Sequence, residues 1–508
     1  MAGARERWAS RPAFIMAAVG SAIGLGNVWR FPGTAFNYGG GAFFVPYFIA
    51  LLTAGIPLMI VEYGLGSRYQ GSAAKSYANL GRRYEWIGWW AVLVGLVISI
   101  YYCVILAWSW VYLGQTLGAL FGDALPWTAK GAQAHFTDDV LQLTGSEAEP
   151  WKFGGMQWWL VLGLFLTWGA VYLSIVKGVL RVGKIVMITV PLPLILLVLL
   201  TVRGLTLPGA SDGLAYYLAP DWSKLLEPKT WLAAYGQVFF SLSVGWGILI
   251  AYASYMSKKT DVVNNAYITS FANCGFSFLA GFAVFSTVGY LGLAQGMPVG
   301  DIKASSFDLA FMTYPTAVEN FPGGHLLQCL IALGFFVMLL SLGVDSAFSI
   351  VEAVATAMYD KFRMPREKLV LLLCVGGFLM GLVYCLGSGK WWLVITDKFL
   401  GDYGLSVVAL VQCVLVAWII PRSKLKDLMN NINSRSELKI GTFWVICIKV
   451  FTPLVLGTAI VLASIDLFTN GYEGYPLAAL ILGGVLPVTA IVVAAFGLQY
   501  MRGKGDAD

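Results

Sequence analysis

The 508-residue sequence has few charged residues and few side chains that bind metals through nitrogen or sulfur. Only 12% of its residues are charged, against about 25% in an ordinary soluble domain, and 58% are hydrophobic. This composition excludes a soluble enzyme. Two histidines, His135 and His325, and seven cysteines without a CxxC pair argue against a metal site of the usual ligand types.

Catalytic motifs are also missing. The sequence has no HExxH and no GxSxG, and the run Gly387-Ser-Gly-Lys390 lacks the spacing and the terminal hydroxyl of a phosphate-binding loop. We therefore predict that the protein is not an enzyme. The formal net charge of +6 does not indicate nucleic-acid binding, because the basic residues concentrate on one side of the predicted membrane spans.

Long apolar runs dominate what is present. A helix needs about 20 mostly apolar residues to cross a bilayer, and twelve runs of this kind predict an all-α polytopic membrane protein. The positive-inside rule places both termini in the cytoplasm. Outer loops without a glycosylation sequon or a cysteine pair favour a bacterial inner membrane. The predicted spans cover residues 12–36, 41–66, 87–121, 157–176, 181–203, 231–256, 262–294, 326–358, 367–388, 391–420, 442–466 and 476–500.

The first and sixth spans contain clustered glycines near mid-membrane, in the runs Gly20-Ser-Ala-Ile-Gly-Leu-Gly-Asn27 and Ser241-Leu-Ser-Val-Gly-Trp-Gly247. Each glycine weakens a helix by about 1 kcal/mol relative to alanine, so both spans are predicted to unwind there. The alternative is that these glycines permit close helix packing. Polar side chains beside the glycines favour unwinding, because exposed backbone groups at that depth must bind a ligand, an ion or protein.

Broken spans five apart fit two five-helix halves of opposite orientation followed by two extra helices. We predict a transport core over residues 1–420, with helices 11 and 12 and a cytoplasmic tail over residues 421–508. Among the ionisable residues within spans, Glu62 is expected to cap a neighbouring broken helix. Asp345 lies in the run Leu342-Gly-Val-Asp-Ser346, whose oxygen ligands suit a hard cation. A single carboxylate favours Na⁺ over Ca²⁺.

From Arg5 to about Asp402 the sequence resembles the neurotransmitter:sodium symporter family. The resemblance rests on the run Gly20–Pro32, on Asn37-Tyr-Gly-Gly-Gly-Ala-Phe-Phe-Val-Pro-Tyr47, and on further segments in the same order. These segments are Tyr101-Tyr102, Gln237–Ser243, Ala253–Tyr255, Asn273-Cys274 and Leu342–Ser346. The resemblance implies a LeuT-like fold and sodium-driven uptake of a small molecule by alternating access.

The resemblance also implies the ligands of three ions. A first Na⁺ would bind the Ala22 carbonyl and the side chains of Asn27, Ser241 and Asn273, together with the substrate carboxylate. A second Na⁺ and a chloride ion would each have their own site. The second Na⁺ would bind Gly20, Ile23, Leu342, Asp345 and Ser346, and the chloride would bind Tyr47, Gln237, Ser241 and Ser277. Because relatives independent of chloride resemble one another in having an acidic residue at the position of Ser277, we expect chloride dependence.

The implied substrate is an α-amino acid, because Gly24 replaces the aspartate that binds the ammonium group in amine-carrying relatives. Trp246 favours glycine, alanine or another small neutral amino acid. The alternative is that Trp246 only packs against a neighbouring helix and leaves room for a larger hydrophobic or aromatic substrate. The implied binding residues are Ala22, Gly24, Leu25, Gly26, Ile98, Tyr102, Phe240, Ser243, Trp246, Ser346, Ala347 and Ile350.

Charged residues at the outer and inner ends of the predicted spans indicate gates that close the transport path. Arg30 with Asp402 would close the outer side, and Asp397 is the second choice for the partner of Arg30. Arg5 with Asp360, beside Trp8 and Tyr255, would close the inner side. The predicted partners are the amino acid and membrane lipid, with no nucleic acid. A channel and a non-transporting amino-acid sensor stay open as alternatives, and a homodimer is one alternative for the oligomeric state.

Overall fold

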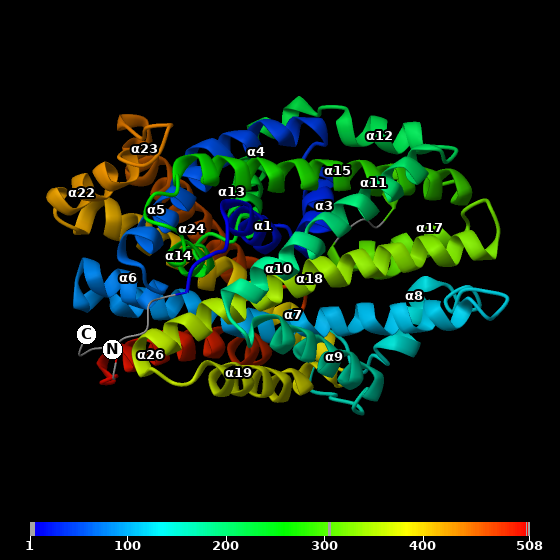
Figure 1. Cartoon of the computed structure of the whole chain (residues 1–508). Coiled ribbons are helices and arrows are strands. Elements are labelled where there is room, and N and C mark those ends of the chain that lie inside the picture. Colours follow the sequence, from blue (N-terminus) through cyan, green and yellow to red (C-terminus); the bar gives the residue numbers. More distant parts are fainter. Residues whose placement is uncertain (1–5, 303–305, 504, 506–508) are drawn as a thin grey trace.

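The computed structural model describes residues 6–302, 306–503 and 505, which form a bundle of helices (Figure 1). Within these residues there is no strand longer than an isolated bridge, and two such bridges pair Gly40 with Pro220 and Met156 with Leu386. The all-α prediction is confirmed. A segment that crosses lipid must satisfy its backbone hydrogen bonds within the protein, and these apolar runs do so by forming helices.

Ten helices among the described residues are long and apolar enough to span a membrane. Most consist of several consecutive helical elements, because short π-helical segments interrupt the α-helices. The ten spans are Gly41–Tyr69 (η1, α4, η2, α5), Arg82–Ala119 (η3, α7), Trp158–Ile175 (α9), Val179–Leu205 (α10, α11), Val263–Gln295 (α15), His325–Phe362 (α18), Arg366–Cys385 (α19, η8), Gly389–Ile419 (α20, η9, α21, η10), Thr442–Asn470 (α23, η11, α24) and Leu477–Tyr500 (α25, η12, α26).

The first predicted span is broken. It consists of α1 (Arg11–Ala22), α2 (Leu25–Val28) and α3 (Arg30–Asn37), and the helix axis bends by 64° at the break. Counted as one span, this bent pair makes eleven. The sixth predicted span is divided into α13 (Pro228–Ser241) and α14 (Ile248–Ser254), each too short to cross alone. These two half-helices account for the difference from the twelve predicted spans.

The remaining helices lie at the two ends of the bundle. The end that the sequence predicts to be cytoplasmic, called the inner end below, carries α6 (Ala73–Leu80) and α22 (Arg422–Asn433). The opposite, outer end carries short helices from the three predicted outer loops. These are α8 (Ala132–Ala134), η4 (His135–Val140), α12 (Ala210–Leu218), η5 (Trp222–Leu226), η6 (Val299–Asp301), α16 (Ser306–Asp308), η7 (Leu309–Thr313) and α17 (Tyr314–Glu319).

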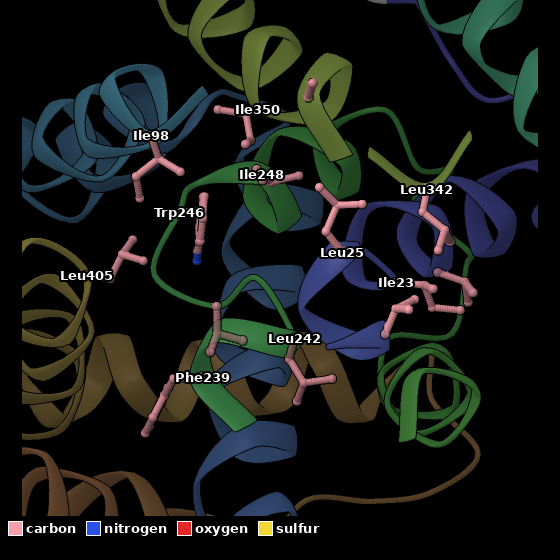
Figure 2. Packing of buried hydrophobic residues seen from close by; sticks show 14 of the residues in the cluster. Ile23, Leu25, Ile98, Phe239, Leu242, Trp246, Ile248, Leu342, Ile350 and Leu405 are labelled. Atoms are coloured by element: carbon pink, nitrogen blue, oxygen red, sulfur yellow. The ribbon is translucent and has the colours of Figure 1, made fainter. Parts of the chain in front are cut away.

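One large hydrophobic core surrounds the two broken spans. The long helices α7 and α18 pack along each other and form one wall (Figure 1). Figure 2 shows Ile98 from α7 and Ile350 from α18 near Trp246, and Ile23 and Leu342 on the other side. The unwound segments therefore lie inside the bundle, away from lipid.

Candidate functional site

The two breaks in the helices lie against each other. Gly24, at the first break, donates its N–H to Oδ1 of Asn27 (2.8 Å). At the second break, Ser243, Gly245 and Gly247 have φ angles of +53°, +88° and +74°, in the left-handed region that favours glycine. The Ser243 hydroxyl donates to the carbonyl of Ser21 (3.1 Å), so the two segments are joined directly.

Glu62 stabilises the second break. Its Oε1 accepts the backbone N–H of Gly245 at 2.9 Å, and the side chain is fully buried. A carboxylate that accepts an orphaned N–H replaces the hydrogen bond that unwinding removes. The predicted capping role of Glu62 is confirmed.

A small cavity of about 40 Å³ lies between the breaks. Eleven of the twelve predicted substrate residues line it, and Ala347 is buried but does not reach the cavity surface. Sequence reasoning assigned no role to Ser21 or Ile248, which also line it. Both are in or directly beside the two unwound segments, which is the signal that could have found them. The cavity is lined by Ser21, Ala22, Gly24, Leu25, Gly26, Asn27, Ile98, Tyr102, Phe240, Ser241, Ser243, Trp246, Ile248, Ser346 and Ile350.

The cavity has a polar end and an apolar end. At the polar end the N–H of Leu25 donates to the Tyr102 hydroxyl (3.4 Å). A Cβ at Gly24 would lie 2.9 Å from Oγ of Ser346, so this position has no room for a side chain. At the apolar end Phe240 and Trp246 meet edge to face, with ring centroids 5.8 Å apart. No charged side chain lines the cavity among the described residues.

The residues of the predicted first sodium site form one hydrogen-bonded cluster. Nδ2 of Asn27 donates to Oδ1 of Asn273 (2.8 Å) and to Oγ of Ser241 (3.2 Å). Nδ2 of Asn273 donates to the same Ser241 hydroxyl (2.7 Å). Ala22 ends α1 directly before the break. Ala22, Asn27 and Ser241 from this cluster line the cavity, and they carry the oxygen groups that hard cations bind.

The predicted second sodium site contains two buried oxygens without a hydrogen-bond partner among the described residues. They are Oδ1 of Asp345 and Oγ of Ser346. The Asp345 carboxylate faces α1, because a Cβ at Gly20 would lie 3.3 Å from its Oδ2. A buried carboxylate with an unsatisfied oxygen costs several kcal/mol unless a cation compensates it. These two oxygens therefore fit a bound cation, and the role of the backbone carbonyls of Gly20, Ile23 and Leu342 stays a prediction.

The predicted anion site likewise contains a buried polar side chain, in this case one that can donate hydrogen bonds. Both amide atoms of Gln237 are buried without a hydrogen-bond partner in the described part of the chain. The Tyr47 hydroxyl contacts Sγ of Cys274 at 3.3 Å. Ser277 accepts a hydrogen bond from Asn27 (2.7 Å), which connects this site to the first sodium site. Hydroxyl and amide donors of this kind suit a small anion.

At the inner end, Trp8 hydrogen-bonds to the backbone at the end of α14. Its backbone N–H donates to the Tyr255 carbonyl (3.1 Å), and its indole N–H donates to the Tyr252 carbonyl (2.9 Å). Asp360 accepts the backbone N–H of Ser72 at 2.7 Å. Arg5 lies outside the described residues, so its predicted pairing with Asp360 stays a prediction.

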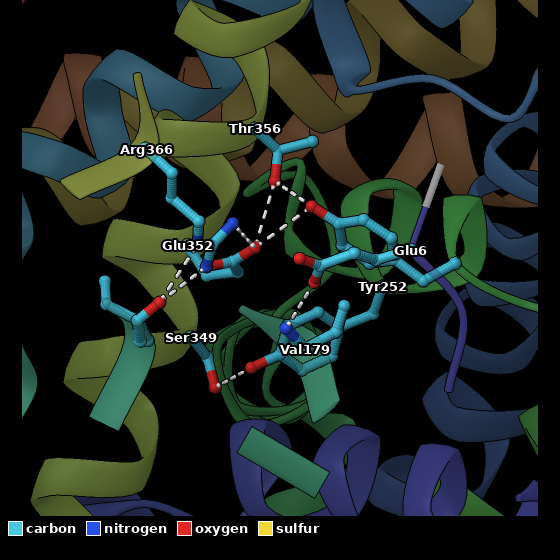
Figure 3. Close-up of polar contacts among 9 residues, drawn as sticks. Glu6, Val179, Tyr252, Ser349, Glu352, Thr356 and Arg366 are labelled. Carbon is cyan, nitrogen blue, oxygen red and sulfur yellow. Dashed lines mark hydrogen bonds and ion pairs between the residues drawn. The ribbon is translucent and has the colours of Figure 1, made fainter. Parts of the chain in front are cut away.

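Figure 3 shows a polar network at this end that the sequence did not predict. The carboxylate of Glu352 is fully buried and pairs with Arg366 from α19 (Nη1 to Oε1, 3.2 Å). Tyr255 donates to the same carboxylate at 3.0 Å. Glu352 is therefore shielded from water inside the bundle. Its charge is compensated by a cation from the next helix, 14 residues along the chain.

At the outer end, the structure places Asp402, the predicted partner of Arg30, in a different ion pair. Asp402 pairs with Lys398 one helical turn away (2.8 Å), so the predicted pairing with Arg30 is not made. Asp397 accepts a hydrogen bond from Tyr101 (2.7 Å) and lies within electrostatic range of Arg30. The guanidinium of Arg30 lies over the Phe240 ring, 4.3 Å from its centre. Asp402 lies in the π-helical turn η9 (Leu400–Leu405), which directly follows α20 (Gly389–Phe399), the helix that carries Asp397 and Lys398.

Comparison with known proteins agrees with this geometry. The model of the sodium:neurotransmitter symporter family matches residues 5–134 and 129–504. A sodium-dependent transporter of Methanocaldococcus jannaschii, itself uncharacterised, is 38% identical over 499 residues, covering 98% of each chain. The sodium- and chloride-dependent GABA transporter 2 of Rattus norvegicus is 33% identical over 535 residues, covering 98% of this chain and 87% of the relative.

The corresponding transporter of Bos taurus is 33% identical over 524 residues, covering 96% of this chain and 85% of the relative. Both the family match and these relatives extend over nearly the whole chain. The broken spans, the buried cavity and the matched family therefore lead to one conclusion. The chain belongs to the sodium:neurotransmitter symporter family and is a sodium-dependent membrane transporter.

Proposed function

We propose that the protein imports a small neutral α-amino acid, glycine or alanine in the first instance, together with two Na⁺ and one Cl⁻. The observation that carries the proposal is the cavity of about 40 Å³ between the two unwound segments. A water molecule needs about 10–15 Å³ of such volume, so this cavity accommodates a ligand with only a few non-hydrogen atoms.

The chemistry of the lining supports a zwitterion. The substrate carboxylate would bind at the break of the first span, near the Tyr102 hydroxyl and the first Na⁺. Helix-end N–H groups favour an anion there. The ammonium group would bind carbonyl oxygens of the unwound segments. Since the lining contains no charged side chain, both substrate charges must be compensated by backbone groups and bound ions.

Residues shared between neighbouring sites would couple the binding of Na⁺ to the binding of the substrate. Asn27 contacts Ser241, Asn273 and Ser277, so the proposed first sodium and chloride sites are one connected cluster. When Na⁺ and the substrate carboxylate touch, each raises the affinity of the other by the same factor. The chloride would compensate the charge that two sodium ions bring into a site with one carboxylate, Asp345.

Thermal stability of the purified protein tests the substrate assignment. A ligand that binds only the native state raises the apparent melting temperature by mass action. We expect glycine and alanine to stabilise the protein in NaCl and to have no effect in choline chloride. The panel includes leucine, tryptophan and γ-aminobutyric acid, because two relatives are GABA transporters. Stabilisation by tryptophan but not by glycine would overturn the small-substrate proposal.

Counterflow in proteoliposomes distinguishes a carrier from the alternatives. A carrier exchanges labelled for unlabelled substrate, whereas a channel or a sensor does not. The variant Trp246→Ala tests the size argument in the same assay, because it removes the indole from the apolar end of the cavity. We expect it to bind leucine better than the parent protein, with glycine binding weakened. An unchanged ligand preference would show that Trp246 only packs against its neighbours.

A further inference from the structure

Cys274 lies beside the predicted ion sites, directly after Asn273 on α15, and none of the assignments above gives it a role. The side chain is buried, and its Sγ lies 3.3 Å from the hydroxyl oxygen of Tyr47. This contact is a hydrogen bond in which either group can supply the hydrogen, because a thiol and a phenol are each both donor and acceptor. The direction of the bond therefore decides what else the Tyr47 hydroxyl can bind.

The ring of Tyr47 is held in place by aromatic neighbours. Tyr47 lies in α4 (Phe44–Ala50) and packs edge to face against Phe31, with ring centroids 5.0 Å apart. Phe43 lies on another side, at 6.1 Å. Tyr47 is buried. Close packing of this kind keeps the hydroxyl oxygen beside α15, so that its hydrogen is the part that can change direction.

The serines of the predicted anion site show why this hydrogen matters. Ser241 accepts hydrogen bonds from both Asn27 and Asn273, which leaves its own hydrogen available to an anion. Ser277 accepts from Asn27 and donates to the carbonyl of Asn273 (3.2 Å), so its hydrogen is already used. With one of the two serine hydrogens engaged, the tyrosine hydrogen becomes important for holding an anion.

We propose that Cys274 is a positioning residue of the chloride site, whose S–H donates to the Tyr47 oxygen and so directs the tyrosine hydrogen toward the bound anion. The inference rests on the proposed chloride coupling. Hydrogen bonds to an ion are about twice as strong as those between neutral groups, so the anion receives the tyrosine hydrogen in preference to the neutral sulfur. In the reverse arrangement Tyr47 would donate to Sγ and could not bind the anion.

Chloride titrations of the purified protein test the proposal without a substrate. Chloride replaces gluconate at constant sodium, and binding is measured as the rise in apparent melting temperature. We expect Cys274→Ala to raise the chloride concentration for half-maximal stabilisation by about three- to tenfold, the range expected for the loss of one buried hydrogen bond. Cys374→Ala, on α19, is the matched control, because both cysteines are 5% exposed, and it should leave this concentration unchanged.

Each other outcome has a distinct meaning. A lower half-maximal concentration in Cys274→Ala would show that the thiol competes with the anion for the tyrosine hydrogen, and an unchanged one would show that it only packs. Either result overturns the proposal while the chloride coupling stands. A parent protein that chloride does not stabilise would instead reject the chloride coupling, and this inference with it.

Two further measurements separate positioning from a structural role. In Tyr47→Phe the phenol is absent, so adding Cys274→Ala should cause no further change in chloride binding, and additive effects would overturn the proposal. The infrared difference between chloride and gluconate should show an S–H stretching band shifted to lower frequency, because a phenol that donates to an anion accepts more strongly. Cys274→Ala should lose this signal and Cys374→Ala should keep it. No shift in the parent protein would overturn the proposed direction of the bond.

Discussion

Individual polar atoms without partners support the proposed ion sites. Oδ1 of Asp345, Oγ of Ser346 and the amide of Gln237 are buried deep in the bundle with no hydrogen bond among the described residues. Leaving such groups unpaired costs about 1–3 kcal/mol each, and more for a charged group. Assigning these groups to bound ions leads to two predictions at this scale.

The first concerns Asp345. Asp345→Asn preserves the size of the side chain and one oxygen ligand but removes the negative charge that would hold the second sodium ion. We expect the sodium concentration for half-maximal uptake to rise by about tenfold or more, which corresponds to about 1.4 kcal/mol of binding free energy. Asp139→Asn, in an outer loop, is the control and should not change it. Unaltered sodium dependence in Asp345→Asn would remove this residue from the sodium site.

The second concerns Ser277. Ser277→Glu introduces a fixed carboxylate in the proposed chloride site, next to Asn27 and Tyr47. We expect uptake by the parent protein to be lost when gluconate replaces chloride, whereas Ser277→Glu should retain uptake in both media. Ser277→Ala is the control and should remain dependent on chloride. If the parent protein transports equally well in gluconate, chloride is not part of the mechanism.

At the scale of elements, two broken helices produce the site. Unwinding removes backbone hydrogen bonds, and neighbouring side chains replace them: Asn27 accepts the N–H of Gly24, and Glu62 accepts that of Gly245. The left-handed φ angles at Ser243, Gly245 and Gly247 turn the chain between α13 and α14. The breaks are therefore specific structures, stabilised by side chains from the same span and from the span of α5 (Ile56–Tyr69).

Glu62 provides the prediction at this scale. Glu62→Leu keeps the side chain bulky but leaves the Gly245 N–H buried and unpaired, at a cost of about 1–3 kcal/mol. We expect a lower apparent melting temperature and a loss of sodium-dependent stabilisation by substrate. Glu62→Gln retains an acceptor oxygen and should restore most of both. Equal loss in the two variants would mean that the charge of Glu62, and not its hydrogen bond, is required.

At the scale of the whole molecule, the outer loops pack onto the bundle. His135, in η4, is buried against Tyr112 and Trp127 and bonds to Gln115 (2.9 Å) and Asp139 (3.3 Å). Burial lowers the pKa of His135 below its ordinary value of 6.5, although Asp139 opposes this shift. The folded state therefore binds a proton less readily than the unfolded state, and the loop is less stable in acid.

Measuring the apparent melting temperature at a series of pH values tests this contribution of His135. As the pH falls below about 6.5, the unfolded state gains a proton at His135 before the folded state does, so the free energy of unfolding decreases. We expect the apparent melting temperature of the parent protein to fall more steeply between pH 7 and pH 5 than that of His135→Gln. His325→Gln serves as the histidine control. Parallel curves for the parent protein and His135→Gln would exclude this contribution.

The sequence by itself determined the helical class, the approximate positions of the apolar spans, and the positions of both breaks. These features follow from local causes, since apolar length sets a span and clustered glycines weaken a helix. The resemblance to the family supplied the eleven predicted residues that line the cavity. Seven of them lie in or beside the segments that unwind, whereas Ile98, Tyr102, Ser346 and Ile350 come from the intact helices α7 and α18. The capping role of Glu62 followed from the shortage of acceptors at that depth in the bilayer.

Only the tertiary structure decided which distant groups meet. Asp402 pairs with Lys398, whereas Asp397 lies within electrostatic range of Arg30. Arg366 compensates the buried Glu352, and Gly505 meets the end of α18. The volume of the cavity also depends on how Phe240 and Trp246 pack against α7 and α18. Such contacts join residues from separate helices, and no pattern within one helix specifies the packing of another.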